Sequence, residues 1–200
     1  MKLAQLTSEN LILLDAVFDD RLAAINALTD KLELTGKLTD KQRFLDAVLK
    51  REEEGPTALG EYLAVPHGKS DAVTEPVFAC AFVKDELMWQ GLDGDEPVNM
   101  IFLLAIPPAQ AGSTHMEVLT TLTSSLVDDD FRDELLKAKT AKEVMKMFGA
   151  EEEELEQASS VAASEQEQLE DEAGKDISKM AYPLVLGAGV LISAFLFLLL

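Results

Sequence analysis

Several residue types on which other classes of protein depend are scarce in this chain. It has one cysteine, Cys80, two histidines and one tryptophan, and aromatic residues make up 6% of its 200 residues. A single cysteine forms no internal disulfide, which excludes a disulfide-stapled secreted scaffold and favours a reducing cytosol. Two histidines without a cysteine cluster make a poor zinc site, because structural zinc takes four ligands. Cys80 lies in the apolar run 76–83, so we expect it in the core.

Basic residues are also scarce. Seventeen lysines and arginines stand against 37 aspartates and glutamates, which gives a formal net charge of −20. Phosphate backbones repel such a chain, so nucleic-acid binding is excluded, whereas a basic protein partner is compatible with it. No phosphate-binding glycine loop and no G-x-S-x-G motif is present. The first residues lack the pattern of a secretory signal, and we expect the domain to start in the cytoplasm.

Composition divides the chain near residue 150. Eleven of the acidic residues but only two of the basic ones follow residue 149. Little apolar material is available there until residue 181, as is typical of a segment that buries no core. We therefore predict a folded domain at 1–149, an acidic flexible linker at 150–178 and a transmembrane helix at 179–200.

The last 20 residues, 181–200, carry no charge. As a helix they are just long enough to cross about 30 Å of hydrocarbon. Lys175 and Lys179 precede them and favour a cytoplasmic location for the domain. A buried core helix, or the truncated start of a longer membrane protein, is the alternative interpretation.

Helical and strand patterns alternate within 1–149, which is typical of an α/β layered fold. Apolar spacing and capping residues predict helices at 19–34, from Thr39 with Gln42 as its capping-box partner, from Thr114 with Glu117, at 130–139, and from Thr140 with Glu143. Short apolar runs predict strands at 62–65, 77–83 and 98–106, with a turn-rich segment at 90–97 and a solvated loop at 128–130.

His67 is the first candidate for chemistry. It ends a short apolar run between Pro66 and Gly68, and we expect this glycine to turn the backbone and leave room beside the ring. An imidazole with one nitrogen free and the other held by an acceptor acts as a phosphoryl or proton carrier. The alternative is a histidine whose ring is satisfied locally in a turn.

Two further residues complete the candidate site. His115 follows the expected cap Thr114, where a helix start presents free N–H groups to an anion. Arg51 ends a predicted helix sixteen residues before His67 and has a guanidinium that binds phosphate oxygens bidentately. The alternatives are a partly buried capping histidine and a surface arginine paired with the glutamates at 52–54.

These residues resemble a known family. The segment Arg51 to Gly68, R-E-E-E-G-P-T-A-L-G-E-Y-L-A-V-P-H-G, and the segment Thr114 to Thr123, T-H-M-E-V-L-T-T-L-T, are similar to motifs of the type 2 enzyme IIA domains of the bacterial phosphotransferase system. The resemblance covers roughly residues 3–149 and is strongest to the fructose branch, including its mannosylglycerate-type relatives.

The resemblance implies a fold and a function. The fold is a mixed β-sheet flanked by helices on both sides, to which the acidic linker and the C-terminal apolar helix are added here. His67 would be phosphorylated as a tele-phosphohistidine, with His115 and Arg51 assisting, and no cofactor or metal would be needed. The phosphate donor would be HPr and the acceptor a cysteine of an enzyme IIB, for uptake of a fructose-like sugar.

Two other roles stay open. Enzyme IIA relatives of the nitrogen-regulatory type report phosphorylation state and bind partner proteins instead of feeding a transporter. The apolar segment 181–200 would tether the domain to the inner face of a bacterial cell membrane, and such a protein would also serve as a scaffold for its partners.

Overall fold

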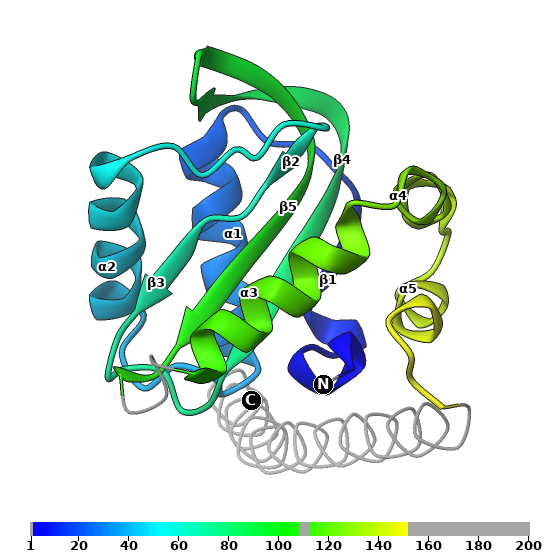
Figure 1. Ribbon diagram of the computed structural model, residues 1–200. Coiled ribbons are helices and arrows are strands. Elements are labelled where there is room, and N and C mark those ends of the chain that lie inside the picture. The colour runs from blue at the N-terminus through cyan, green and yellow to red at the C-terminus, as the bar shows by residue number, and fades with distance from the viewer. Residues whose placement is uncertain (1, 109–112, 152–200) are drawn as a thin grey trace, which may run out of the picture. The chain divides into compact units, whose positions relative to one another are not determined.

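A computed structural model describes residues 2–108 and 113–151 of the chain. Its centre is a mixed five-stranded sheet in the order β1-β4-β5-β2, with β3 also paired to β5 (Figure 1). Only the β4–β5 pairing is antiparallel. The strands are β1 (Ile12–Ala16), β2 (Leu63–Ala64), β3 (His67–Lys69), β4 (Val77–Gly91) and β5 (Gly94–Ile106).

Helices cover both faces of this sheet. Two short 3₁₀ turns, Leu3–Leu6 and Glu9–Leu11, precede β1. The α-helices are α1 (Arg21–Leu34), α2 (Lys41–Glu54), α3 (Ser113–Leu126), α4 (Asp129–Lys137) and α5 (Ala141–Met147). Helix α1 packs against β4 and α2 against β3, whereas α3 crosses the opposite face of the sheet from α1 (Figure 1). The predicted α/β fold with helices on both sides is therefore confirmed.

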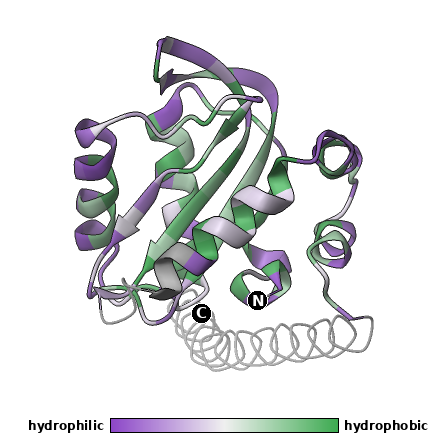
Figure 2. Cartoon of the chain, in the orientation of Figure 1, coloured by the Kyte–Doolittle hydropathy of each residue, from purple (hydrophilic) through white to green (hydrophobic). Residues whose placement is uncertain are grey.

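The two long strands form the centre of the core. Every residue of Val77–Val83 in β4 is buried, as is every residue of Met100–Ile106 in β5, so both strands are covered on both faces. Figure 2 shows these parts of the two strands in green, whereas the hairpin end of both is largely purple. Cys80 is fully buried, as predicted, and burial raises the pKa of its thiol well above the ordinary value.

The β4–β5 hairpin is longer than the sequence pattern indicates. Pairing continues to Gly91 and Gly94, so most of the predicted turn-rich segment 90–97 is strand. From residue 86 onward the side chains alternate: Leu87 and Trp89 are buried while Met88 is exposed. This half-buried alternation sustains the ladder after the fully buried run ends. Strand β1 was not predicted at all.

Three helix starts differ in detail from the prediction. Asp40, not Thr39, caps α2, because its carboxylate accepts the Arg43 N–H while Thr39 donates to the Ala72 carbonyl. Helix α4 begins at Asp129 with Asp128 as its cap, so the predicted loop at 128–130 is a helix start. An aspartate at this position satisfies a free helical N–H and complements the helix dipole. Helix α3 begins at Ser113, one residue before the predicted cap.

Other predicted ends are confirmed. Thr140 caps α5 by accepting the Glu143 N–H at 3.2 Å. Gly36 and Gly149 follow α1 and α5 with φ of 72° and 91°, the left-handed conformation that glycine adopts without strain.

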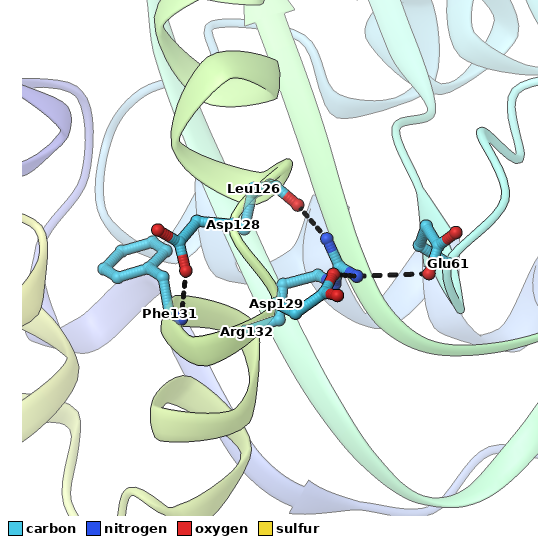
Figure 3. Close-up of polar contacts among 6 residues, drawn as sticks. All are labelled: Glu61, Leu126, Asp128, Asp129, Phe131 and Arg132. Carbon is cyan, nitrogen blue, oxygen red and sulfur yellow. Dashed lines mark hydrogen bonds and ion pairs between the residues drawn. The ribbon is translucent and has the colours of Figure 1, made fainter.

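A buried arginine ties α4 to the rest of the domain. The side chain of Arg132 is 9% exposed, and its guanidinium donates to the Leu126 carbonyl at the end of α3, to Asp129, and to Glu61 at 3.1 Å (Figure 3). Glu61 lies in the segment before β2 and has a positive φ of 52°. One side chain thus links the end of α3 and the start of α4 to a segment 71 residues earlier in the chain.

The first compact unit of the chain is Met1–Glu151. Apart from residues 150 and 151, the predicted linker at 150–178 lies outside the described residues, as does the predicted transmembrane helix at 179–200. None of the helices in the described ranges combines the length and apolar composition that a membrane span requires.

Candidate functional site

His67 is the first residue of β3. It pairs in parallel register with Leu104 of β5, and the Leu104 N–H donates to the carbonyl of the preceding Pro66 at 3.0 Å. The predicted strand at 62–65 is present as β2, whereas the predicted turn at Gly68 is wrong, because His67–Lys69 form the separate strand β3. A rigid strand therefore sets the direction of the ring, which is half-buried.

Two hydrogen bonds define the state of the His67 ring. Nδ1 lies 2.9 Å from the Val65 carbonyl, which only accepts, so Nδ1 carries the proton. Nε2 accepts from the Nε–H of Arg51 at 3.0 Å, and a guanidinium only donates. Together these partners select the neutral tautomer with hydrogen on Nδ1 and a lone pair on Nε2.

Burial is the main cause that lowers the pKa of His67 from its ordinary value of 6.5. The positive charge of Arg51 also lowers this pKa, and the bond to Val65 opposes both by raising it. Protonation of Nε2 would place two donors, that nitrogen and Arg51 Nε, against each other. The ring is therefore kept neutral, as a nucleophile requires.

Arg51 approaches the ring from the last turn of α2. Its Nη1 donates to the Gly55 carbonyl at 3.0 Å, so the guanidinium is held between the ring and the end of its own helix. The alternative that Arg51 pairs with the following glutamates does not hold among the described contacts. The structure thus brings together two of the three predicted site residues, Arg51 and His67.

Gly68 has a different function from the predicted one. A Cβ at this position would lie 2.7 Å from Val48 Cγ2 and 2.9 Å from Phe44 Cε2, both on α2. Its φ is not in the left-handed region, so the glycine makes no sharp turn. Instead, the missing side chain lets α2 pack closely on β3, and this close packing brings Arg51 within reach of His67.

A cleft of about 520 Å³ opens beside the ring. Its lining residues come from α2, β3 and the end of β5: Ala47, Lys50, Arg51, Glu54, His67, Gly68, Lys69 and Ile106. Three of these eight side chains are cationic, in a chain whose net charge is −20. In the described part of the chain neither Lys50 nor Lys69 forms an ion pair, so both ammonium groups are available to an anion in the cleft.

His115 is the third predicted residue and lies in the first turn of α3. Helix α3 follows β5 after a connection at 107–112, and β5 is the strand that pairs with His67. The described side chains of this helix begin at Glu117, so the environment of the His115 ring lies outside them. Its proximity to His67 therefore stays a prediction. Among the described side chains, Val118, Leu122 and Leu126 form the buried side of the helix, whereas Leu119 is only partly buried.

Sequence reasoning missed a buried polar cluster next to the site, formed by Glu52, Thr57 and Trp89. Glu52 and Thr57 stand inside the recognised motif, but Trp89 is 32 residues beyond Thr57, and only the fold joins them. Within the described ranges, no three acidic, histidine or cysteine side chains are grouped closely enough to hold a metal ion.

The site therefore lies on a mixed sheet flanked by helices, where a neutral histidine and an arginine face a cleft lined by cationic side chains. The family profile described as phosphoenolpyruvate-dependent sugar phosphotransferase system, EIIA 2, matches residues 5–150. The chain therefore belongs to the type 2 EIIA family of that system, as the sequence motifs predicted.

Two relatives show how the match is distributed. The 2-O-α-mannosyl-D-glycerate-specific EIIABC component of Escherichia coli K12 is 48% identical over 145 residues, which are 72% of this chain and 22% of that protein. The fructose-specific EIIA component of Haloferax volcanii is 32% identical over 142 residues, which are 71% of this chain and 91% of that protein. This chain thus spans under a quarter of the first relative's length and nearly all of the second's.

A solved structure has the same fold. The nitrogen regulatory protein IIA-Ntr from Neisseria meningitidis superposes with a TM-score of 0.66 at 25% identity, covering 72% of this chain and 97% of that one. The family therefore includes proteins named for sugar transport and for nitrogen regulation.

Proposed function

We propose that this domain carries a phosphoryl group on Nε2 of His67. It accepts the group from phospho-HPr and passes it to a cysteine of an enzyme IIB. The observation that carries the proposal is the state of the ring: neutral, with its proton held on Nδ1 by Val65 and its lone pair on Nε2 at the cationic cleft.

The chemistry of each step balances without a cofactor. The Nε2 lone pair attacks phosphorus as the bond from phosphorus to the donor breaks, and the Nδ1 proton stays in place. Arg51 then donates to phosphoryl oxygens instead of to Nε2. In the second step the enzyme IIB thiolate attacks phosphorus, and the P–Nε2 bond breaks to restore the lone pair. The protein mainly positions the groups and stabilises charge in the transition state.

His115 assists this transfer in the proposal. The amino end of α3, where it lies, presents free N–H groups that favour an anion. Its predicted task is to support transfer onward to enzyme IIB.

The test is incubation with phosphoenolpyruvate, enzyme I and HPr, with phosphate incorporation compared between the native chain and His67→Ala. We expect stoichiometric labelling of the native chain and none of the variant. Equal labelling of the two chains would overturn the proposal. His115→Ala should still be labelled but should transfer poorly to enzyme IIB, and normal onward transfer would remove His115 from the mechanism.

The sugar served belongs, in this proposal, to the fructose-like branch. The 48% identity to the mannosylglycerate-specific relative and the 32% identity to a fructose-specific one support this branch. Because the domain itself would contact only its protein partners, a panel of enzyme IIB acceptors identifies the pathway. The enzyme IIB that removes phosphate from the domain fastest identifies the pathway.

A second candidate function is regulation. The similarity to IIA-Ntr of Neisseria meningitidis favours it. In that case phosphorylated and unphosphorylated domains would bind a partner protein with different affinity, and no enzyme IIB would discharge His67. The acceptor panel therefore separates the two functions.

Attachment to the inner face of the cell membrane through 181–200 is a separate proposal, supported by 20 consecutive uncharged residues. Deletion of 177–200 should move the protein from the membrane to the soluble fraction. Unchanged fractionation would remove both the tether and the scaffold role that depends on it.

A further inference from the structure

A buried polar cluster lies where α2 ends. Glu52, Thr57 and Trp89 are 6%, 2% and 0% exposed. Thr57 Oγ1 donates to Glu52 Oε1 at 2.6 Å, and Trp89 Nε1 donates to Glu52 Oε2 at 3.1 Å and to Thr57 Oγ1 at 2.9 Å. A carboxylate this deeply buried costs stability unless its oxygens are bonded, and here each oxygen has a donor.

Thr57 connects this cluster to the acceptor of the His67 proton. The Thr57 carbonyl accepts the Val65 N–H at 2.9 Å. The carbonyl of the same Val65 accepts Nδ1–H of His67 at 2.9 Å. Two consecutive hydrogen bonds therefore lead from the backbone of Thr57, whose hydroxyl is fixed by Glu52 and Trp89, to the imidazole.

The other bond to the ring leads back to the same segment. Arg51, which donates to Nε2, is also bonded to the Gly55 carbonyl at 3.0 Å. Glu52 follows Arg51 in α2. Its hydrogen bond to Thr57 spans Gly55 and Pro56 and so fixes this segment against the end of α2. The segment 55–57 thus supports both hydrogen bonds that define the tautomer of His67.

We infer that Glu52, Thr57 and Trp89 are positioning residues, which hold the segment 55–57 so that Val65 and Arg51 fix the His67 ring with its lone pair on Nε2. The hydrogen bonds described for these three side chains join them to one another and not to the ring. Without the cluster, Val65 and Arg51 no longer hold Nδ1 and Nε2 of the ring. A second tautomer, with its proton on Nε2, then becomes populated. The consequence for phosphoryl transfer rests on the proposed function, whereas the effect on the ring does not.

The test uses the full chain and ring ¹⁵N NMR, which reports tautomer and pKa directly. Because the chain has only two histidines, a His115→Gln variant assigns both signals. The native ring should show the Nδ1–H form. Thr57→Val, which removes the hydroxyl at nearly constant shape, should give a mixture of tautomers. Thr57→Ser keeps the hydroxyl and should restore the native signals.

Two further variants keep the test decisive. Trp89→Phe removes the indole donor, as well as part of a buried ring system, and should likewise give a mixture of tautomers if Thr57→Val does not fold. Val144→Ala, at a fully buried position of α5, lowers stability without touching the cluster and should leave the ring unchanged. If the cluster only stabilised the fold, every destabilised variant would keep the native tautomer of His67 in its folded molecules.

The kinetic consequence is measured as phosphate incorporation from phospho-HPr at equal folded fraction. A small misplacement of reacting groups costs on the order of tenfold to a hundredfold in rate. We expect at least about a tenfold loss for Thr57→Val and for Trp89→Phe, and none for Val144→Ala. Native tautomer and native rate in both cluster variants would overturn the inference. Absence of phosphorylation in the native chain would reject the proposed function instead, while the tautomer comparison would still decide the positioning role.

Discussion

The Nε–H of Arg51 donates to Nε2 of His67 over 3.0 Å, so the arginine occupies the nitrogen that we propose as the phosphoryl acceptor. A guanidinium in this position disfavours protonation of the ring and keeps its lone pair free of a proton. In the proposed mechanism the same guanidinium donates to the phosphoryl oxygens once Nε2 is phosphorylated. One side chain would then serve both the resting ring and the phosphorylated one.

Replacement of Arg51 tests both roles. In Arg51→Met the loss of the positive charge should raise the pKa of His67, and phosphate incorporation should fall about a hundredfold, the usual cost of removing one transition-state donor. Arg51→Lys keeps the charge but not the planar guanidinium. It should therefore restore the pKa of His67 more fully than it restores the rate of phosphate incorporation. NMR titration and labelling rates measure the two. A native rate in Arg51→Met would contradict the prediction.

The lowered pKa of His67 also predicts how stability depends on pH. Below its ordinary value of 6.5, the unfolded histidine binds a proton that the folded one resists, so the unfolded state holds more protons. Stability therefore rises with pH through this window. As the pH falls from about 7 to about 5, the unfolding free energy of the native chain should therefore decrease relative to that of His67→Gln.

Urea unfolding of both chains across this range measures that difference. Other titrating groups are common to the two chains and cancel. Above about pH 7 the difference should be constant, since neither state then binds the proton. A difference that shifts in favour of the native chain at low pH would show that the folded pKa is raised instead.

Gly68→Ala should separate α2 from β3. The new Cβ would lie 2.7 Å from Val48 Cγ2, so we expect a loss of about 1–3 kcal/mol in unfolding free energy and slower phosphorylation as Arg51 withdraws. The double variant with Val48→Ala lacks the clashing methyl group. Its loss of unfolding free energy should therefore be smaller than the sum of the two single losses. Gly55→Ala is the matched control, because its Cβ meets nothing within 4 Å. Simple additivity would contradict the steric explanation.

The links made by Arg132 should differ in strength according to burial. Arg132→Met keeps the apolar stem but leaves the Leu126 carbonyl without its donor, which costs about 1–3 kcal/mol. Asp129→Asn removes only an ion-pair partner whose side chain is 84% exposed, and should cost under about 0.5 kcal/mol. Denaturant unfolding of both variants checks the order. Equal losses would mean that the ion pair, and not the carbonyl bond, anchors α4.

Lys69 should stabilise the phosphorylated state from its position beside His67 in the cleft. It is exposed and lies two residues beyond His67 in β3, so both side chains are on one face of the strand. Lys69→Gln should speed the loss of phosphate by up to about fivefold at low salt and less at high salt, as for an exposed charge pair. Lys84→Gln, at an exposed position of β4, is the control. Identical phosphate lifetimes in the two variants would remove Lys69 from the site.

Much of this protein follows from local patterns in its sequence. Helical spacing of apolar residues located the helices to within a few positions, and continuous apolar runs located the central parts of β4 and β5. The motif from Arg51 to Gly68 identified the family and named Arg51 and His67 as partners. These features depend on neighbours along the chain, because caps, periodicity and turns are encoded within a few residues.

Only the tertiary structure decided how those residues work together. The sequence alone did not show that Arg51 faces Nε2, that Gly68 is needed for the approach of α2, or that Trp89 bonds to Glu52 across 37 positions. Sheet register and helix packing set these contacts, and both arise from burying apolar surface over the whole domain rather than from any short segment. The motif therefore named the two residues, and the fold determined which atom of each faces the other.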